Sequence, residues 1–274
     1  YEISVCDWSS DVCSSDLAFE IGTRGQPVAA YLNVDEMIRV AVEAGAEAIY
    51  PGYGFLSENP ALPRAAAAAG LTFIGPSAEV LEKTGHKVLA KQRAKEAGMS
   101  VLRSTPASAD LDELVQTARD LTFPVFVKAV AGGGGRGMRR IESPDQLVES
   151  LDSAMREARA AFDDPTMFLE EAVRRPRHVE VQVLADSAGD VVHLYTRDCS
   201  IQRRHQKVIE IAPAPNLPDD VRERLHADAI AFARAVGYVN AGTVEFLVET
   251  EGPRAGEHFF IEMNPRIHVE HSVT

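Results

Sequence analysis

The sequence Pro124-Val-Phe-Val-Lys-Ala-Val-Ala-Gly-Gly-Gly-Gly-Arg-Gly-Met138 places a lysine just ahead of four consecutive glycines. Its first half is short, apolar and rich in β-branched residues, which predicts a strand that delivers Lys128 to a loop. Residues 138–141 predict the returning strand. Consecutive glycines leave backbone N–H groups unobstructed and allow positive φ, so the loop can surround an anion. The pattern indicates a phosphate-binding flap, with a flexible hairpin tip as the plain alternative.

Two familiar nucleotide-binding motifs do not fit this stretch. A P-loop requires the lysine after the glycines and a helix directly behind it, whereas here the lysine comes first and a strand follows. A dinucleotide fingerprint also requires a glycine turn that opens a helix. We therefore expect a nucleotide to be clamped by a strand, a loop and a second strand.

A second group of polar residues lies near the C-terminal end of the sequence. Glu245 and Glu262 lie in predicted strands at 239–248 and 258–263, which turn-forming residues separate, so a hairpin would bring their carboxylates together. Such carboxylates repel by roughly 1 to 4 kcal/mol near a surface, and a cation reverses the sign. Together with Asn264 they offer the oxygen ligands that suit Mg²⁺. Solvated glutamates on an exposed hairpin are the alternative.

A dense cationic run, Arg197-Asp-Cys-Ser-Ile-Gln-Arg-Arg-His-Gln-Lys207, lies inside an acidic protein. The formal net charge is -13, from 41 acidic and 28 basic residues, so the overall field would repel a nucleic acid. A small anion is the better partner for this run. Gln202, His205 and Lys207 are the functional candidates, and Arg203 and Arg204 are expected to be solvated.

In this combination the chain resembles the biotin carboxylase family of ATP-grasp ligases. The resemblance covers residues 18–274 and rests on three motifs in the order found in the family. They are Lys-x-x-x-Gly-Gly-Gly-Gly-Arg-Gly-Met at 128–138, Gln-Arg-Arg-His-Gln-Lys at 202–207, and Glu-Met-Asn-x-Arg-Ile-x-Val-Glu-His at 262–271. Within the family, the residues at 126–132, 197–200 and 261–266 are more similar to pyruvate carboxylases than to acyl-CoA carboxylases.

The resemblance implies an α/β protein with an ATP-grasp fold behind the remnant of an N-terminal α/β domain. We expect residues 18–86 to be part of the biotin carboxylase N-terminal domain and residues 87–274 to be an ATP-grasp domain truncated at its C-terminal end. Residues 1–17 repeat Ser-Ser-Asp and hold the single Trp and two of the three cysteines. We interpret them as an extraneous leader.

The resemblance also assigns the nucleotide and metal contacts. Lys87 and Lys128 would bind ATP phosphates under the glycine flap, and the segment 170–173 would form the adenine hinge. The carboxylates of Glu245 and Glu262 would hold Mg²⁺ or Mn²⁺ across the phosphates. The implied ATP-binding residues are Lys87, Lys128, Gly132, Gly133, Gly134, Gly135, Glu170, Glu171, Val173, His178, Gln202, His205 and Leu247. The implied metal ligands are Glu245, Glu262 and Asn264.

For the second substrate the resemblance implies a bicarbonate site formed by Arg266, His268, Val269 and Glu270. Glu270 would deprotonate bicarbonate, which attacks the γ-phosphate to give carboxyphosphate, while Arg266 and Lys207 hold the anion. Biotin on a separate carrier domain would then be carboxylated. Position 268 departs from the family, which usually has Gln there; an imidazole lacks the paired donor and acceptor of an amide, and its charge varies near neutral pH.

The expected partners are bicarbonate, the biotinylated carrier domain, a carboxyltransferase region outside this chain, and further copies of the full-length protein. No apolar run approaches the roughly 18 residues of a membrane span. Cys199 is the only cysteine outside residues 1–17, which favours a reducing cytoplasm. Three rival functions remain: the biotin carboxylase subunit of an acyl-CoA carboxylase, another ATP-grasp ligase, and an inactive nucleotide-binding fragment.

The remaining chain shows a regular α/β alternation. An Asn33 and Glu36 capping box predicts a helix that ends at Gly45. In His178-Val-Glu-Val-Gln-Val183 the alternation predicts a strand with one buried face. Further helices are predicted at 61–69, 77–83, 87–97, 110–120, 143–162 and 218–236. Further strands are predicted at 48–50, 72–74, 167–171 and 191–196.

Overall fold

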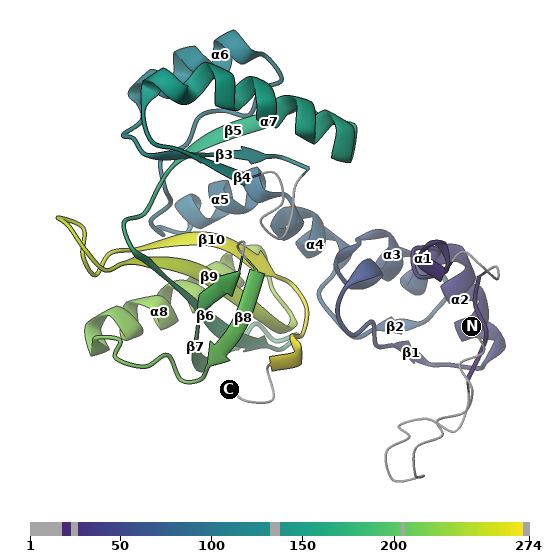
Figure 1. Cartoon of the computed structure of the whole chain (residues 1–274). Coiled ribbons are helices and arrows are strands. Elements are labelled where there is room, and N and C mark those ends of the chain that lie inside the picture. Colours follow the sequence, from purple (N-terminus) through teal and green to yellow (C-terminus); the bar gives the residue numbers. More distant parts are fainter. Residues whose placement is uncertain (1–17, 23–26, 132–137, 204–205, 271–274) are drawn as a thin grey trace.

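A computed structural model describes residues 18–22, 27–131, 138–203 and 206–270. These residues form an N-terminal α/β region, a small sheet covered by helices, and a larger sheet with helices packed against it (Figure 1). The predicted α/β class is confirmed. Among the described helices, none is both long and apolar enough to cross a membrane.

The N-terminal region consists of short helices around two parallel strands. Its capping prediction is confirmed, because the side chain of Asn33 accepts a hydrogen bond of 3.1 Å from the backbone N–H of Glu36. Such a cap satisfies a donor that the helix itself leaves unpaired. The elements are α1 (Pro27–Ala30), α2 (Val34–Glu43), β1 (Ala48–Ile49), a 3-10 helix (Phe55–Glu58), α3 (Ala61–Ala68), β2 (Thr72–Phe73) and α4 (Ala78–Gly85).

The small sheet contains the predicted strand of Lys128. Its strands β3 (Val125–Ala129), β4 (Met138–Ile141) and β5 (Met167–Glu171) are antiparallel in the order β4-β3-β5. Helices α6 (Leu111–Thr117) and α7 (Leu147–Phe162) cover one face (Figure 1). Val125, Val127 and Leu151 are fully buried between the sheet and the helices. Alternation along β3 therefore points Phe126 and Lys128 to the opposite face.

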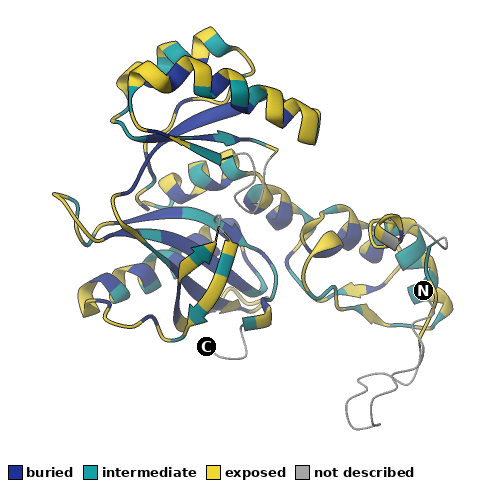
Figure 2. Cartoon of the chain, viewed as in Figure 1, coloured by how far each residue is buried: buried dark blue, intermediate teal, exposed yellow. Residues whose placement is uncertain are grey.

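The larger sheet is antiparallel, with the strand order β10-β9-β6-β7-β8. Helix α8 shows the predicted apolar stripe, whose residues are buried against the sheet together with α5 (Figure 2). This packing leaves the opposite face of the sheet for polar side chains. The elements are α5 (Lys87–Glu96), β6 (Pro176–Ala185), β7 (Val191–Arg203), β8 (Gln206–Ile211), α8 (Asp219–Val236), β9 (Asn240–Glu249) and β10 (His258–Asn264).

Several predicted boundaries were wrong, most clearly in the cationic run. The strand predicted at 191–196 continues to Arg203, and β8 was not predicted at all. Cross-strand partners neutralise several charges of this run, which allows it to form strands, as described below. The helix predicted at 110–120 ends as α6 at Thr117 and continues as a 3-10 helix (Ala118–Asp120), and the one predicted at 143–162 begins with a 3-10 helix (Pro144–Gln146).

Candidate active site

A cavity of about 550 Å³ lies where the small sheet, the larger sheet and α5 meet. It gathers most of the residues that the sequence analysis assigned to ATP, metal and bicarbonate. Those that line it are Lys87, Lys128, Glu170, Glu171, Val173, His178, Gln202, Lys207, Glu245, Leu247, Glu262, Asn264, Arg266, His268 and Glu270.

The remaining candidates are Val269 and five residues that the structure does not describe. Val269 is exposed and does not line the cavity, although both of its neighbours in the sequence do. Gly132, Gly133, Gly134, Gly135 and His205 lie outside the described residues.

On the small-sheet side, the carboxylate of Glu170 is shared by two lysines. Lys128 contacts one of its oxygens and Lys91 of α5 contacts the other. Burial, and then the charge of Lys87, lower the pKa of Lys128 to about 8. Burial also lowers the pKa of Lys91, helped by the charge of Lys128. Lys87 lines the same wall, so three lysines face one carboxylate there and the wall attracts an anion.

Lys91 was missed by the sequence analysis. It lies one helical turn after Lys87, so the i, i+4 spacing places both lysines on the same face of α5. That spacing was the available signal for a second lysine in the site. It identifies Lys91 only when β5 is known to bring Glu170 next to this face of α5. Lys91 also lies over the ring of Phe168, 5.2 Å from its centroid.

An apolar wall lies beside the lysines. Leu102, Val173 and Phe259 form a small buried cluster, against which the partly buried Leu247 packs. The side chain of Glu171 is held by the backbone N–H of Thr122, which donates at 2.9 Å, so this carboxylate serves the local packing. The wall provides the flat, apolar contact that a planar base requires.

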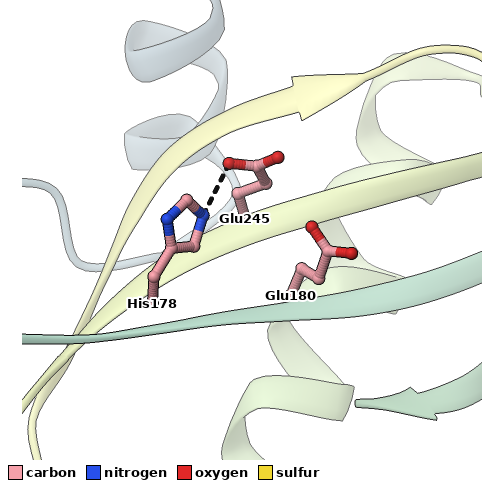
Figure 3. Close-up of side chains that lie close together, drawn as sticks. All are labelled: His178, Glu180 and Glu245. Atoms are coloured by element: carbon pink, nitrogen blue, oxygen red, sulfur yellow. Dashed lines mark hydrogen bonds and ion pairs between the residues drawn. The ribbon is translucent and has the colours of Figure 1, made fainter. Parts of the chain in front are cut away.

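The larger sheet holds the two predicted carboxylates opposite each other. Glu245 of β9 and Glu262 of β10 are direct cross-strand partners, which confirms the predicted hairpin. Glu245 accepts hydrogen bonds from Lys207 Nζ at 2.9 Å and from Asn264 Nδ2 at 2.6 Å through Oε1, and from His178 Nε2 at 2.7 Å through Oε2 (Figure 3).

These contacts give the two carboxylates different protonation behaviour. Burial opposes the charged form of Glu245, but hydrogen bonding by His178 and the charge of Lys207 together lower its pKa to about 2. Burial, and then the charge of Glu245, raise the pKa of Glu262. A cation between them would relieve this repulsion, and the amide oxygen of Asn264 remains available as a further ligand. The residues present therefore fit the predicted Mg²⁺.

His178 is held from both sides of its ring. Gln202 Nε2 donates to Nδ1 at 2.7 Å, which leaves Nε2 to donate to Glu245. Burial lowers the pKa of His178, but the hydrogen bond to Glu245 outweighs it and the net shift is upward. This chain of contacts fixes the imidazole beside the carboxylates, whereas the sequence analysis expected His178 to contact ATP.

A buried ionic network beneath the site was missed. Glu180 of β6 accepts hydrogen bonds of 2.5 Å from Arg197 Nε and from Lys207 Nζ. Arg197 is fully buried and donates further to Gln182 Oε1 at 2.9 Å and to Thr243 Oγ1 at 3.1 Å. Despite its burial, Glu180 has a pKa well below the usual range, because His268, Lys207 and Arg197 stabilise its charge.

Figure 3 shows Glu180 beside His178 and Glu245, and their ligand atoms lie within 4.8 Å of one another. We do not assign this triad to a metal, because both oxygens of Glu180 already accept hydrogen bonds from cations. The pairing instead positions Lys207, whose ammonium joins Glu180 to Glu245. Burial opposes its charge, but the two carboxylates raise the pKa of Lys207 overall.

The predicted bicarbonate residues follow β10, and three of them, Arg266, His268 and Glu270, line the cavity. Arg266 Nε donates to Glu58 Oε1 at 2.7 Å, so the N-terminal region helps to place this guanidinium. The buried His268 lies with Nδ1 3.1 Å from Glu270 Oε1. A guanidinium and a carboxylate at the end of a metal and phosphate site can bind a small oxyanion and accept its proton.

Comparison with known proteins defines the class to which this site belongs. The family described as the carbamoyl-phosphate synthase L chain, ATP binding domain, matches residues 86–274, and the biotin carboxylase N-terminal domain matches residues 7–81. The chain belongs to the biotin carboxylase family of ATP-grasp ligases. The N-terminal match begins inside the stretch interpreted as a leader, and residues 1–17 lie outside the described residues.

The curated relatives it resembles are pyruvate carboxylases. This chain is 51% identical to pyruvate carboxylase 1 of Caenorhabditis elegans over 261 residues. The aligned stretch covers 95% of this chain and 22% of the relative. Mitochondrial pyruvate carboxylase of Mus musculus is 49% identical over the same shares. The chain thus spans about a fifth of the length of these relatives.

Solved structures agree in fold. Biotin carboxylase of Campylobacter jejuni, in complex with β,γ-ATP, matches with a TM-score of 0.84 and 46% identity over 92% of this chain and 55% of its own. Rhizobium etli pyruvate carboxylase matches with a TM-score of 0.82 and 46% identity, and the match covers 95% of this chain and 22% of that protein. The biotin carboxylase domain of Hydrogenobacter thermophilus 2-oxoglutarate carboxylase, with MgADP and bicarbonate, matches with a TM-score of 0.86 and 42% identity. This match covers 94% of this chain and 56% of the neighbour.

Proposed function

We propose that this chain performs the biotin carboxylase half-reaction as part of a pyruvate carboxylase. In this reaction MgATP activates bicarbonate to carboxyphosphate, and biotin on a separate carrier domain is then carboxylated. The observation that carries the proposal is the arrangement of one cavity: lysines on one wall, opposed glutamates on the other, and Arg266 with Glu270 at the end.

The nucleotide would lie between the two sheets. Lys87 and Lys128 would bind its phosphates, and Leu247 and Val173 would contact the adenine. When ATP arrives, Lys128 would exchange Glu170 for phosphate, while Lys91 keeps that carboxylate charged. The exchange replaces one buried ion pair by another and leaves no charge uncompensated.

Glu245, Glu262 and Asn264 would hold Mg²⁺, or Mn²⁺ in its place, across the phosphates. A bound cation neutralises charge on the transferred phosphoryl group. Arg266 would anchor bicarbonate through its N–H donors, and Lys207, held between two carboxylates, would steady the same anion. Glu270 would take the bicarbonate proton.

The final acceptor, partners and location are part of the same proposal. Pyruvate is favoured as the acceptor by the names of the relatives, although the 2-oxoglutarate carboxylase neighbour shares the fold. A carboxyltransferase region, a biotin carrier and a homo-oligomeric assembly would belong to the complete protein. We propose domain limits at 18–86 and 87–274. A cytoplasmic location stays a prediction, since the mammalian relatives are mitochondrial by name.

Calorimetric titration of MgATP into the chain and into Lys128→Ala tests the nucleotide site. A hydrogen bond to a charged group contributes about 1.5 to 3 kcal/mol, so the variant should bind roughly 10- to 100-fold more weakly. Lys95→Ala, on the exposed side of α5, is the matched control and should bind like the wild type. A cooperatively folded chain that ignores MgATP, or binds it equally well without Lys128, contradicts the proposal.

A further inference from the structure

His268 lies between two carboxylates. Its Nδ1 atom is 3.1 Å from Glu270 Oε1 and 3.9 Å from Glu180 Oε1. The imidazole is 3% exposed, so bulk water has little access to it. A glutamine at this position could hydrogen-bond the same carboxylates, but it could not hold a proton at neutral pH.

The charges around His268 come from three strands and from its own segment. Glu180 is already paired with two cations, whereas Glu270 lies nearer to the imidazole and faces the cavity. Burial, and then the charge of Glu180, raise the pKa of Glu210, although the charges of Lys207 and Arg197 act in the opposite direction. The charged and titratable groups are Glu180 of β6, Arg197 of β7, Lys207 and Glu210 of β8, and Arg266 and Glu270 beside it.

A glutamate alone is a weak base for bicarbonate. Its reference pKa is about 4.3, so a proton that it accepts near pH 7 returns readily to the anion or to water. An imidazole within 3.1 Å of the accepting oxygen, with a reference pKa of about 6.5, holds such a proton far better. A second carboxylate, that of Glu180, has its Oε1 atom 3.9 Å from the same Nδ1 atom, and its negative charge stabilises the imidazolium that results.

We propose that His268 is the terminal proton acceptor for bicarbonate and works through Glu270; this inference rests on the proposed function. The O–H bond of bicarbonate breaks, and its proton passes to Glu270 and on to His268 Nδ1. The electron pair stays on the oxygen, which forms a bond to the γ-phosphorus of ATP. The bond from that phosphorus to the β,γ-bridging oxygen breaks, and its electrons leave with ADP.

His268 must be neutral at the start for this step to occur. Protonation before the reaction fills the acceptor and pairs Glu270 with a cation, so the rate falls as a lower pH protonates the imidazole. A glutamine cannot produce this acid limb. The histidine therefore confers a pH dependence near neutrality that the usual residue of the family would not.

The test is the pH profile of bicarbonate-dependent ADP release in the wild type and in His268→Gln, each with MgATP affinity measured alongside. We expect the variant to bind MgATP normally, to lose about tenfold or more in kcat near pH 8, and to lack the acid limb between about pH 6 and 8. His226→Gln, a substitution on α8 outside the cavity, should keep the wild-type profile.

An identical pH profile and rate in His268→Gln overturns the inference while leaving the proposed function standing. A wild type that binds MgATP but releases no ADP in response to bicarbonate defeats the proposed function, and the inference with it. Because the variant could fold poorly, a second measurement uses ¹⁵N-histidine NMR to titrate His268 in the wild type and in Glu270→Gln. Coupling predicts a lower His268 pKa in Glu270→Gln, and an unchanged titration overturns the inference.

Discussion

The two sheets that enclose the cavity hold their charged residues in different ways. On the small sheet, Lys128 and Glu170 stand over an apolar core, and Lys91 arrives from α5. On the larger sheet, charged side chains of four neighbouring strands contact one another, and Arg197 is fully buried among them. The first arrangement can exchange partners when a ligand binds, whereas the second is fixed before any ligand arrives.

The difference indicates a division of labour. A preorganised network costs no rearrangement at the moment of reaction, which suits the wall that would hold the metal and bicarbonate. In the proposed function the lysine wall would exchange an ion pair for a nucleotide phosphate, and the Lys128–Glu170 pair is a simple one. The predictions below test how firmly each side is fixed.

The largest effect is expected from Glu180→Ala. The change removes the Glu180 partner of the buried Arg197 and leaves Glu210 Oε2 at 3.8 Å from its Nε atom, and breaking a buried pair in this way costs roughly 3 to 5 kcal/mol. Urea unfolding measures the loss. Glu157→Ala, which removes an exposed partner of Arg139 at 2.7 Å, is the matched control and should cost less than about 1 kcal/mol.

A double variant sharpens the first prediction. Replacing Arg197 by Met in the Glu180→Ala background removes the stranded charge, so part of the stability should return. If Glu180→Ala unfolds like the Glu157→Ala control, the network does not fix the larger sheet and the contrast between the two walls is lost.

A smaller effect of opposite sign is expected from Glu262→Gln in metal-free protein. The folded-state pKa of Glu262 is raised, first by burial and then by Glu245, so its contribution to stability is present below the unfolded pKa and is lost as the pH rises through the folded pKa. The variant should therefore be more stable than wild type at pH 8, by about 1 to 4 kcal/mol, and equal to it near pH 4.

Thermal unfolding with and without Mg²⁺ completes that experiment. The wild type should gain stability from Mg²⁺ at pH 8, and Glu262→Gln should gain much less, because a ligand has been removed. Equal stabilisation of both proteins by Mg²⁺ would show that the cation binds elsewhere.

The smallest effect concerns His226, which stacks on His193 with ring centroids 3.8 Å apart. Burial, and then the charges of His193 and Arg222, lower the pKa of His226 to about 4. The unfolded chain binds a proton more readily, so stability is fully present above about pH 6.5 and falls as the pH drops toward 4. Solvent screening at this partly exposed position limits the loss to about 1 kcal/mol or less.

His226→Gln should flatten the pH dependence of stability between about pH 4 and 6.5 while leaving stability at pH 8 nearly unchanged. Urea unfolding at four pH values across this range measures the slope. A slope equal to that of the wild type would show that other groups carry it. The pKa of His226 is thus lowered, whereas the pKa of His178 is raised by its carboxylate partner.

Much of this arrangement could be predicted from the sequence because it follows from local patterns. The strand of Lys128, the capped helix α2 and the hairpin that pairs Glu245 with Glu262 each depend on residues close together in the chain. The stripe of α8 follows from helical periodicity in the same way. Such features need no knowledge of which distant strands pair.

The missed residues depend on pairing between distant strands. Glu180 meets Arg197 across β6 and β7, and Glu245 across β6 and β9, so its role appears only once the strand order is known. The alternation of β6 predicted one buried face, but Glu180 and Gln182 on the opposite face are buried as well, because they hydrogen-bond Arg197 beneath the site. The three hydrogen-bonding residues that follow one another on that face, His178, Glu180 and Gln182, were the available signal that the face is buried.

The most direct test of the whole account is ADP release from MgATP by the folded chain, measured with and without added bicarbonate in bicarbonate-depleted buffer. The account predicts background release without bicarbonate and a saturable increase with it, which Glu270→Gln abolishes. ATP cleavage that is independent of bicarbonate, or that is unchanged in Glu270→Gln, would contradict the account.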